Sequence, residues 1–363
     1  MRKIFTYIKS HPLSVLLLAF PLTLLAEYGN WGPISVFLFA ALGVIPMAGY
    51  IGEATEALAH YTGPKIGGLL NATLGNAAEL IITLVAIREG LFDLVKASIT
   101  GSILGNLLLV LGMSIFLGGI KNGIQHFDKR QAGNHATLLI LSILALVIPS
   151  LFSHSIGGDT DPKVEALSLG VAGVMIVLYA LGIIYSLRQA KSGPLIYSAN
   201  EPQTKPSFSI RTAIIILVLA TGSVVWLSEL LVGATEAVVA NLGLSEFFLG
   251  IILIPLIGNV AEHLVAVQTA YHNKMDLSVE IAVSSSLQIA LLVAPLLVFI
   301  SLAMGKPLTL IFNPFELAAL GSGVLITALV SIDGESNWLE GSALLAVYLI
   351  LAIAFFLLPM VTV

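Results

Sequence analysis

Long apolar runs follow one another along almost the whole chain, and polar, Gly or Pro residues separate them. A run of about 20 apolar residues is long enough to cross the hydrocarbon core of a bilayer as an α-helix. Only 10% of the 363 residues are charged, against about 25% in soluble domains, and the mean hydropathy is +1.00. The chain is therefore predicted to be an all-α integral membrane protein without a separate soluble domain.

The residues between the runs divide the chain into eleven expected spans. These are Pro12–Glu27, Pro33–His60, Ile66–Arg88, Leu91–Gly119, Gln131–Phe152, Pro162–Leu187, Thr212–Leu242, Phe247–His272, Asp276–Met304, Pro314–Ile332 and Asn337–Met360. The first run resembles a signal peptide, but no small-x-small cleavage site precedes Glu27, so we expect it to remain as a span. Asp93 and Asp276 are expected to cap the helices that they open.

Loop charges predict the orientation of the chain. Twelve of the sixteen Lys and Arg residues lie in loops on the side of the N-terminus, which the positive-inside rule places in the cytoplasm. Eleven spans then place the C-terminus outside. Size and the lack of targeting extensions favour the cytoplasmic membrane of a bacterial cell, with membrane lipid around it, and leave an organelle open.

Several partners and chemistries are excluded or left open by the composition. The net charge of −5 and the lack of a basic patch with interleaved aromatic residues argue against nucleic acid. The absence of Cys excludes disulfides and thiolate metal sites. The sequence leaves open whether the protein forms a homo-oligomer.

One short motif occurs twice, as Gly75-Asn76-Ala77-Ala78-Glu79 and as Gly258-Asn259-Val260-Ala261-Glu262. The offset of 183 between the two glutamates also relates Asp93 to Asp276 and Ser102 to Ser285, so a longer segment repeats in register. Five spans belong to each copy, and an odd number inverts the second copy relative to the first. The expected organisation is a peripheral helix (1–32), a first inverted repeat (33–187), a cytoplasmic linker that can act as a hinge (188–211) and a second inverted repeat (212–363).

The two glutamates are the main functional candidates, because an ionisable side chain inside an apolar span costs about 2.5–3.5 kcal/mol. Sites of inverted-repeat transporters lie at the repeat interface near the midplane, so Glu79 and Glu262 are predicted to face each other there. Neutral oxygen donors accompany them: Asn76, Asn259, Ser102, Ser285, Asn106 and Gln288. Two carboxylates with neutral oxygens suit a hard divalent cation such as Ca²⁺. Gly75 and Gly258 are positions where a helix can break and expose carbonyl groups.

The same pair of carboxylates predicts exchange. Two ionised glutamates neutralise one divalent cation, whereas an empty pair repels and takes up protons. The alternative is a protonated pair that only joins helices by hydrogen bonds, and small polar residues also pack membrane helices. Glu56 and Glu236 are interpreted either as proton relays and gate contacts or as polar anchors. His263 is interpreted as a residue that tunes Glu262 or passes a proton, or as a plain contact between helices, while His126, His135 and His154 are expected to be solvated.

These motifs, together with Gly101-Ser102-Ile103-Leu104-Gly105-Asn106 and Ser284-Ser285-Ser286-Leu287-Gln288, resemble the bacterial calcium/proton antiporters of the calcium/cation antiporter superfamily. The resemblance implies that Glu79 and Glu262 bind the cation and carry protons, with the six neutral residues in support. It also implies that the second and seventh spans slide across a fixed core. Sodium/calcium exchangers of the superfamily typically have Pro directly before the motif Glu, and here neither Glu has one, which favours protons as the countersubstrate.

Other classes of protein remain to be weighed against a Ca²⁺/H⁺ exchanger without a cofactor. The same fold can exchange with Na⁺ or K⁺, or move Mn²⁺ or Cd²⁺. A passive channel fits less well, because single buried carboxylates in an inverted repeat favour alternating access. A membrane enzyme is disfavoured, because the chain contains neither Gly-x-Ser-x-Gly nor His-Glu-x-x-His.

Overall fold

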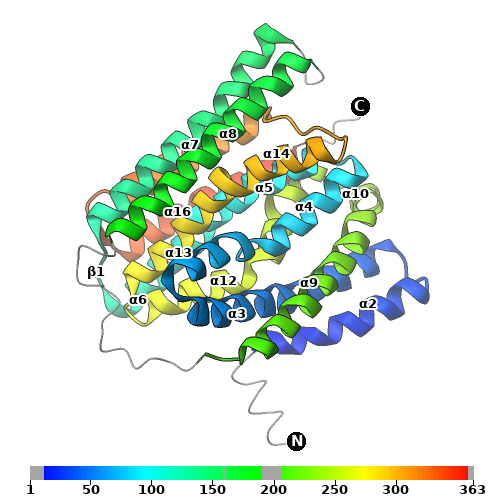
Figure 1. Cartoon of the computed structure of the whole chain (residues 1–363), viewed down its shortest axis with the longest axis horizontal. Coiled ribbons are helices and arrows are strands. Elements are labelled where there is room, and N and C mark those ends of the chain that lie inside the picture. The colour runs from blue at the N-terminus through cyan, green and yellow to red at the C-terminus, as the bar shows by residue number, and fades with distance from the viewer. Residues whose placement is uncertain (1–11, 158–160, 190–205, 359–363) are drawn as a thin grey trace, which may run out of the picture.

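The computed structural model describes residues 12–157, 161–189 and 206–358, and helices make up nearly all of it (Figure 1). The first half contains η1 (Pro12–Leu18), α2 (Ala19–Tyr28), α3 (Pro33–Leu74), α4 (Ala77–Glu89), α5 (Phe92–Leu104), η2 (Gly105–Val110), α6 (Leu111–Asn122), β1 (Gln125–His126), α7 (Lys129–Ile156) and α8 (Pro162–Gln189). The second half contains α9 (Ile210–Gly233), α10 (Thr235–Leu242), α11 (Glu246–Phe248), η3 (Leu249–Leu253), α12 (Ile254–Tyr271), α13 (Met275–Gln288), η4 (Ile289–Val293), α14 (Ala294–Ala303), α15 (Pro314–Val330), β2 (Glu335–Ser336) and α16 (Trp338–Leu357). Most of the expected linker, 190–205, lies outside the described residues.

Eight of the described helices are long and apolar enough to cross a membrane, and Leu13–Tyr28 and Pro314–Val330 are shorter apolar helices. The prediction of an all-α membrane protein is therefore confirmed. The expected span Ile66–Arg88 is not one helix, because its first part ends α3, its second part is α4, and Gly75 and Asn76 separate them.

A sharp turn inside α3 explains how that broken span begins. Gly63 has a φ of 79°, a left-handed conformation that glycine adopts without a steric penalty. Beyond it the chain packs back on itself, so that a Cβ atom on Gly67 would meet the Cβ of Ala59 at 2.9 Å. The expected seventh span is also divided, because α9 ends at Gly233 and α10 continues as a separate short helix.

The two halves share one irregular element at matching positions. Helices α5 and α13 begin at Phe92 and Met275, which are 183 residues apart, and each continues through a π-helical turn (η2 or η4) into α6 or α14. A π-helical turn accommodates an extra residue in a helix and is frequent at functional sites. Both halves therefore carry the same irregularity beside polar residues that the motifs single out.

Contacts between loops show which loops share an end of the molecule. At one end, β1 pairs with β2 in antiparallel orientation, with Gln125 opposite Ser336. At the other end, the Lys306 ammonium group donates to the carbonyl of Arg88, and the Leu310 N–H donates to Ser168 Oγ at 3.0 Å. When successive spans cross the membrane in opposite directions, the segments that contact each other in each of these pairs lie on the same side.

The helices cross most closely where glycines replace side chains. A Cβ atom on Gly101 of α5 would overlap the backbone of Ile251 in η3, and one on Gly250 would lie 2.5 Å from the Cβ of Ala97. Small residues let membrane helices approach each other in this way. This crossing joins the first half to the second directly beside Ser102.

The expected capping roles of Asp93 and Asp276 are wrong. The N-cap positions are Leu91 and Lys274, and both aspartates lie in the first turn, where a carboxylate interacts favourably with the positive end of the helix dipole. Asp93 lies 3.5 Å from Lys96 Nζ, and Asp276 accepts a hydrogen bond from the Asp128 N–H at 2.6 Å.

Candidate functional site: two glutamates from the two halves

The first motif lies at a break between helices. Helix α3 ends at Leu74, where the Gly75 N–H donates to the Asn71 carbonyl at 2.8 Å, and α4 begins at Ala77 with Asn76 at its N-cap position. Glu79 lies in the first turn of α4, next to the positive end of its dipole. Its side chain is buried, with 3% of its surface exposed. The expected break at Gly75 is thus present.

The second motif differs, because α12 continues through Gly258 without a break. The expectation of a break there is wrong. Pro255 has no N–H and stands at the start of α12, so the irregular backbone of this span is the π-helical turn η3 just before it. Glu262 therefore extends from the interior of a regular helix, and it is partly exposed where Glu79 is buried.

Each glutamate lies against the glycine of the other motif. A Cβ atom on Gly258 would lie 3.0 Å from Cγ of Glu79, and one on Gly75 would lie 3.6 Å from Oε1 of Glu262. Both contacts cross from one half of the chain to the other. The two carboxylates are thus neighbours, and the absence of a side chain at Gly258 leaves room for Glu79.

Two donors approach the same oxygen of Glu79. The Ser102 hydroxyl and the Asn259 amide, the latter at 2.5 Å, both donate to Oε1. The other oxygen, Oε2, is buried and has no hydrogen-bond partner within the described part of the chain. A buried polar atom without a partner costs free energy, so this oxygen is available for a proton or a cation.

A chain of hydrogen bonds leads away from Glu262. The Ser285 hydroxyl donates to Oε2 of Glu262 at 3.2 Å, and the Asn106 amide donates to Ser285 Oγ at 3.0 Å. Nε2 of His263 lies 3.2 Å from Oδ1 of Asn106. His263 therefore contacts the neighbouring helix and not Glu262 itself.

The two remaining amides join the same region. The Asn76 amide donates to Oε1 of Gln288 at 2.8 Å, and Oδ1 of Asn76 lies 3.5 Å from Ser285 Oγ. All eight residues expected around a cation therefore lie in two adjoining networks, and each network combines both halves of the chain. A narrow pocket beside them is lined by Ser102, Gly105, Leu109, Pro255, Leu256, Asn259, His263 and Tyr348. Whether these residues bind a cation stays a prediction.

The chemistry of the site is that of carboxylate, amide and hydroxyl groups. In the described residues no group of three or more His, Asp or Glu side chains converges as a metal-binding cluster. A cation held by Glu79 and Glu262 would therefore complete its coordination with neutral oxygens, which suits a hard ion and not a soft one.

Glu56 and Glu236 are not brought to this site. Both are exposed, on α3 and α10, and no hydrogen bond given for the described residues joins them to the two networks. They occupy matching positions one residue after the buried Thr55 and Thr235. Their roles as relay, gate contact or anchor stay open predictions.

Two polar contacts at the ends of the spans were missed from the sequence. His135 was expected to be solvated, but only 17% of its side chain is exposed, and its Nδ1 lies 3.7 Å from Oε2 of Glu280. Glu316 is buried in the first turn of α15, where it accepts hydrogen bonds from the Asn313 N–H at 2.7 Å and from Thr100 at 3.4 Å. A signal for the first existed: Asp276, Glu280, Ser284 and Gln288 follow one another at intervals of four.

A helical membrane protein whose two similar halves each supply one glutamate to a shared internal site has the architecture of a secondary transporter. The model of the sodium/calcium exchanger protein family matches residues 32–188 and 212–357. The chain belongs to this family. Its relatives are transporters and not enzymes, as the sequence predicts.

Curated relatives and a solved structure cover nearly the whole chain. A Ca²⁺/H⁺ antiporter of Aphanothece halophytica is 44% identical over 359 residues, covering 95% of this chain and 96% of its own. The Ca²⁺/H⁺ antiporter ChaA of Bacillus subtilis is 44% identical over 344 residues, covering 93% and 96%. The structure of native YfkE superposes with a TM-score of 0.83 at 42% identity, covering 95% of this chain and all of that one.

Proposed function

We propose that this protein is a Ca²⁺/H⁺ antiporter that moves Ca²⁺ out of the cytoplasm, and that Glu79 and Glu262 bind either one Ca²⁺ or protons. Two relatives with 44% identity over almost the full length are named Ca²⁺/H⁺ antiporters. The observation that carries the proposal for the site is the reciprocal packing of each glutamate against the other motif's glycine, with Oε2 of Glu79 buried and without a partner.

Charge balance gives the reason for exchange. With Ca²⁺ bound, two carboxylates cancel the charge of the ion. Without it, two adjacent carboxylates shielded from water repel each other, and protons remove that repulsion. The site is close to neutral when it holds Ca²⁺ and when it holds protons, whereas the empty site with two ionised glutamates is negatively charged. The two substrates therefore compete for the same oxygens, and the protein exchanges them.

Alternating access is proposed to come from movement of α3 and α9 against the remaining helices. These two helices pack along each other through small residues: Ala54 and Ala57 of α3 and Ala213 of α9 share a buried cluster. Gly43 lies against Leu227, so that a Cβ atom there would be 3.2 Å from the Leu227 side chain. These contacts hold α3 and α9 close together, so the two helices can move as one unit against the remaining helices.

The proposed location is the cell membrane, with the N-terminus in the cytoplasm and the C-terminus outside. Because the chain has no Cys, single cysteines can be introduced into loops and labelled in intact cells with an impermeant maleimide. A cysteine at Met304, between α14 and α15, is expected to react before lysis. One at Asn122, next to β1, is expected to react only after lysis, and the reverse pattern would overturn the orientation.

Transport in liposomes tests the function. Vesicles with an acidic interior are expected to take up ⁴⁵Ca²⁺, and a protonophore is expected to stop the uptake. Glu79→Gln and Glu262→Gln are expected to abolish it, while Glu335→Gln, a matched change in the exposed β2 strand, keeps it. Uptake that ignores the pH gradient but follows a Na⁺ gradient would refute proton exchange, and uptake that survives loss of either glutamate would refute the shared site.

A further inference from the structure

Helix α13 carries a line of polar side chains from its first turn to the site. Asp276, Glu280, Ser284 and Gln288 are spaced at intervals of four, so they lie along one side of the helix. Twelve residues of α-helix extend over roughly 18 Å. The line therefore connects the loop end of α13 with the residues around the carboxylate pair.

Exposure separates this side of α13 from the side that packs in the core. Ser278, Ser285 and Ser286 are buried. Asp276 is exposed, Glu280 has 40% of its side chain exposed, and Ser284 and Gln288 are partly exposed. Polar residues that remain partly exposed at increasing depth in a membrane helix face water or a cavity and not lipid. This line is therefore the less buried side of α13, and it carries the polar side chains of that helix.

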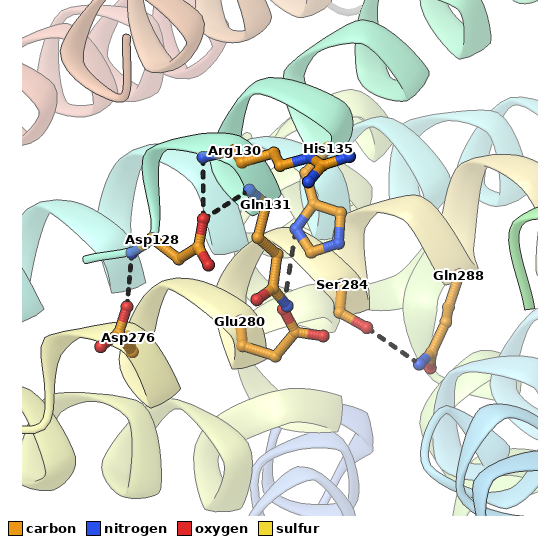
Figure 2. Close-up of polar contacts among 8 residues, drawn as sticks. All are labelled: Asp128, Arg130, Gln131, His135, Asp276, Glu280, Ser284 and Gln288. Carbon is orange, nitrogen blue, oxygen red and sulfur yellow. Dashed lines mark hydrogen bonds and ion pairs between the residues drawn. The ribbon is translucent and has the colours of Figure 1, made fainter. Parts of the chain in front are cut away.

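Two residues of α7 converge on Glu280, as Figure 2 shows. The Gln131 amide donates to Oε2 of Glu280, and Nδ1 of His135 lies 3.7 Å from the same oxygen. Nδ1 of His135 is buried and forms no hydrogen bond within the described part of the chain. An imidazole at this distance forms an ion pair with the carboxylate only when the imidazole carries a proton, so uptake of one proton changes the interaction between the two groups.

The far end of the line joins the site directly. The Gln288 amide donates to Ser284 Oγ at 3.4 Å (Figure 2), and Oε1 of Gln288 accepts from Asn76 at 2.8 Å. Asn76 immediately precedes the helix that carries Glu79. Glu280 stands about 12 Å before Gln288 along the helix, so it lies outside the cation site but on the way to it.

We propose that Glu280 and His135 form a proton-exchange site, which loads and unloads the protons that travel along α13 to Glu79 and Glu262. This inference rests on the proposed function. In the loading direction, a proton from bulk water adds to the Glu280 carboxylate or to Nδ1 of His135. When this proton is released, the Glu280 carboxylate or the His135 imidazole returns to its original state. The proton then adds to the carboxylate of Glu79 or Glu262 as Ca²⁺ leaves. No other group is oxidised, reduced or consumed.

The elements that pack against α13 carry further charged residues, and none of the contacts described for them involves Glu280. Arg130 and Lys129 lie in the first turn of α7, and Lys274 precedes α13. Nζ of Lys121 in α6 lies 3.7 Å from the centre of the Tyr271 ring, and His126 of β1 lies 3.5 Å from Glu335. The π-helical turns η2 and η4 carry no charged residue, and Asp93 and Lys96 of α5 pair with each other. The charged residues of α12, Glu262 and His263, belong to the site.

The experiment compares two modes of transport in the same liposomes. Ca²⁺/H⁺ exchange needs proton movement, whereas exchange of ⁴⁵Ca²⁺ for unlabelled Ca²⁺ at equal pH on both sides does not. Glu280→Gln and His135→Gln are expected to slow Ca²⁺/H⁺ exchange about tenfold or more and to change its pH profile, with Ca²⁺/Ca²⁺ exchange within twofold of wild type. Glu280→Asp is expected to restore much of the rate. His126→Gln and Glu335→Gln remove a similar pair at the same end of the molecule and are expected to change neither mode.

Three other results would each contradict either this inference or the proposed function. Wild-type rates and pH profile of Ca²⁺/H⁺ exchange in both variants would overturn the inference and leave the proposed function intact. Equal loss of both modes would overturn it too, because the pair would then serve the cation route or the structure. Failure of the wild type itself to exchange Ca²⁺ for H⁺ would refute the proposed function instead.

Discussion

The hydroxyl of Ser102 is predicted to set how tightly the site holds Ca²⁺. It is one of two donors to Oε1 of the buried Glu79. A hydrogen bond to a charged group contributes about 1.5–3 kcal/mol, and every 1.4 kcal/mol is about tenfold in affinity. Because Ca²⁺ requires the ionised carboxylate that this bond stabilises, Ser102→Ala is expected to raise the Kd for Ca²⁺ roughly 10- to 100-fold.

Two further serine variants, Ser114→Ala and Ser285→Ala, provide comparisons for the effect of Ser102→Ala on the Kd for Ca²⁺. Ser114 lies in α6 of the same apolar segment, is also buried, and has no hydrogen-bond partner within the described residues. Removing an unpartnered hydroxyl is close to neutral, so Ser114→Ala is expected to leave the Kd within about twofold. Ser285→Ala, which loses a 3.2 Å bond to the partly exposed Glu262, is expected to fall between the two.

The assay is equilibrium binding of ⁴⁵Ca²⁺ to purified protein in detergent at fixed pH, with thermal unfolding as a check on the fold. A Kd that is highest for Ser102→Ala, intermediate for Ser285→Ala and lowest for Ser114→Ala would support a cation site built on Glu79. Equal Kd values for Ser102→Ala and Ser114→Ala, with both proteins folded, would refute the reasoning.

Three further predictions follow from the same contacts. If Ca²⁺ displaces up to two protons, as proposed, the logarithm of its Kd should fall with rising pH with a slope between about −1 and −2 in acidic buffer, and a flat profile would contradict competition. Gly101→Ala, whose Cβ would overlap the backbone of Ile251, should destabilise the fold by about 1–3 kcal/mol or more in thermal unfolding, whereas Gly133→Ala, with open space around it, should not. Nη1 of Arg88 in α4 lies 2.9 Å from Oε1 of Glu229 in α9, and both side chains are exposed. Arg88→Gln should therefore change the transport rate by less than tenfold, and the wild-type rate should depend on salt. An inactive variant would contradict the small contribution expected of an exposed ion pair.

The sequence was sufficient for the membrane class, and it singled out the residues of the candidate site. Glu79 and Glu262 stand out because a charge in an apolar run is costly, and their repetition at an offset of 183 identifies two related halves. Hydrophobic runs and repeats are properties of neighbouring residues, so they can be read before the chain is folded. The six accompanying polar residues were chosen as neutral oxygen donors within and after the two motifs, and the structure places all of them in the two networks that contain the glutamates.

Differences between the two halves could not be read in this way. Gly75 and Gly258 occupy the same motif position, but only the first lies at a helix break, because Pro255 and η3 provide the irregularity of the second span. Glu79 is also buried, whereas Glu262 is partly exposed. The solvated role expected for His135 failed for a similar reason, since Glu280, its neighbour, lies 145 positions away in the sequence.

The sequence by itself thus determined the membrane class of the chain, the repetition of one motif in two halves, and which chemical groups the two copies bring. The tertiary structure decided which side chains face each other. Hydropathy and spacing act locally along the chain, whereas Asn259 reaches Glu79 where Gly258 leaves room for that side chain. His135 reaches Glu280 because α7 packs against α13, and the two residues are far apart in the sequence.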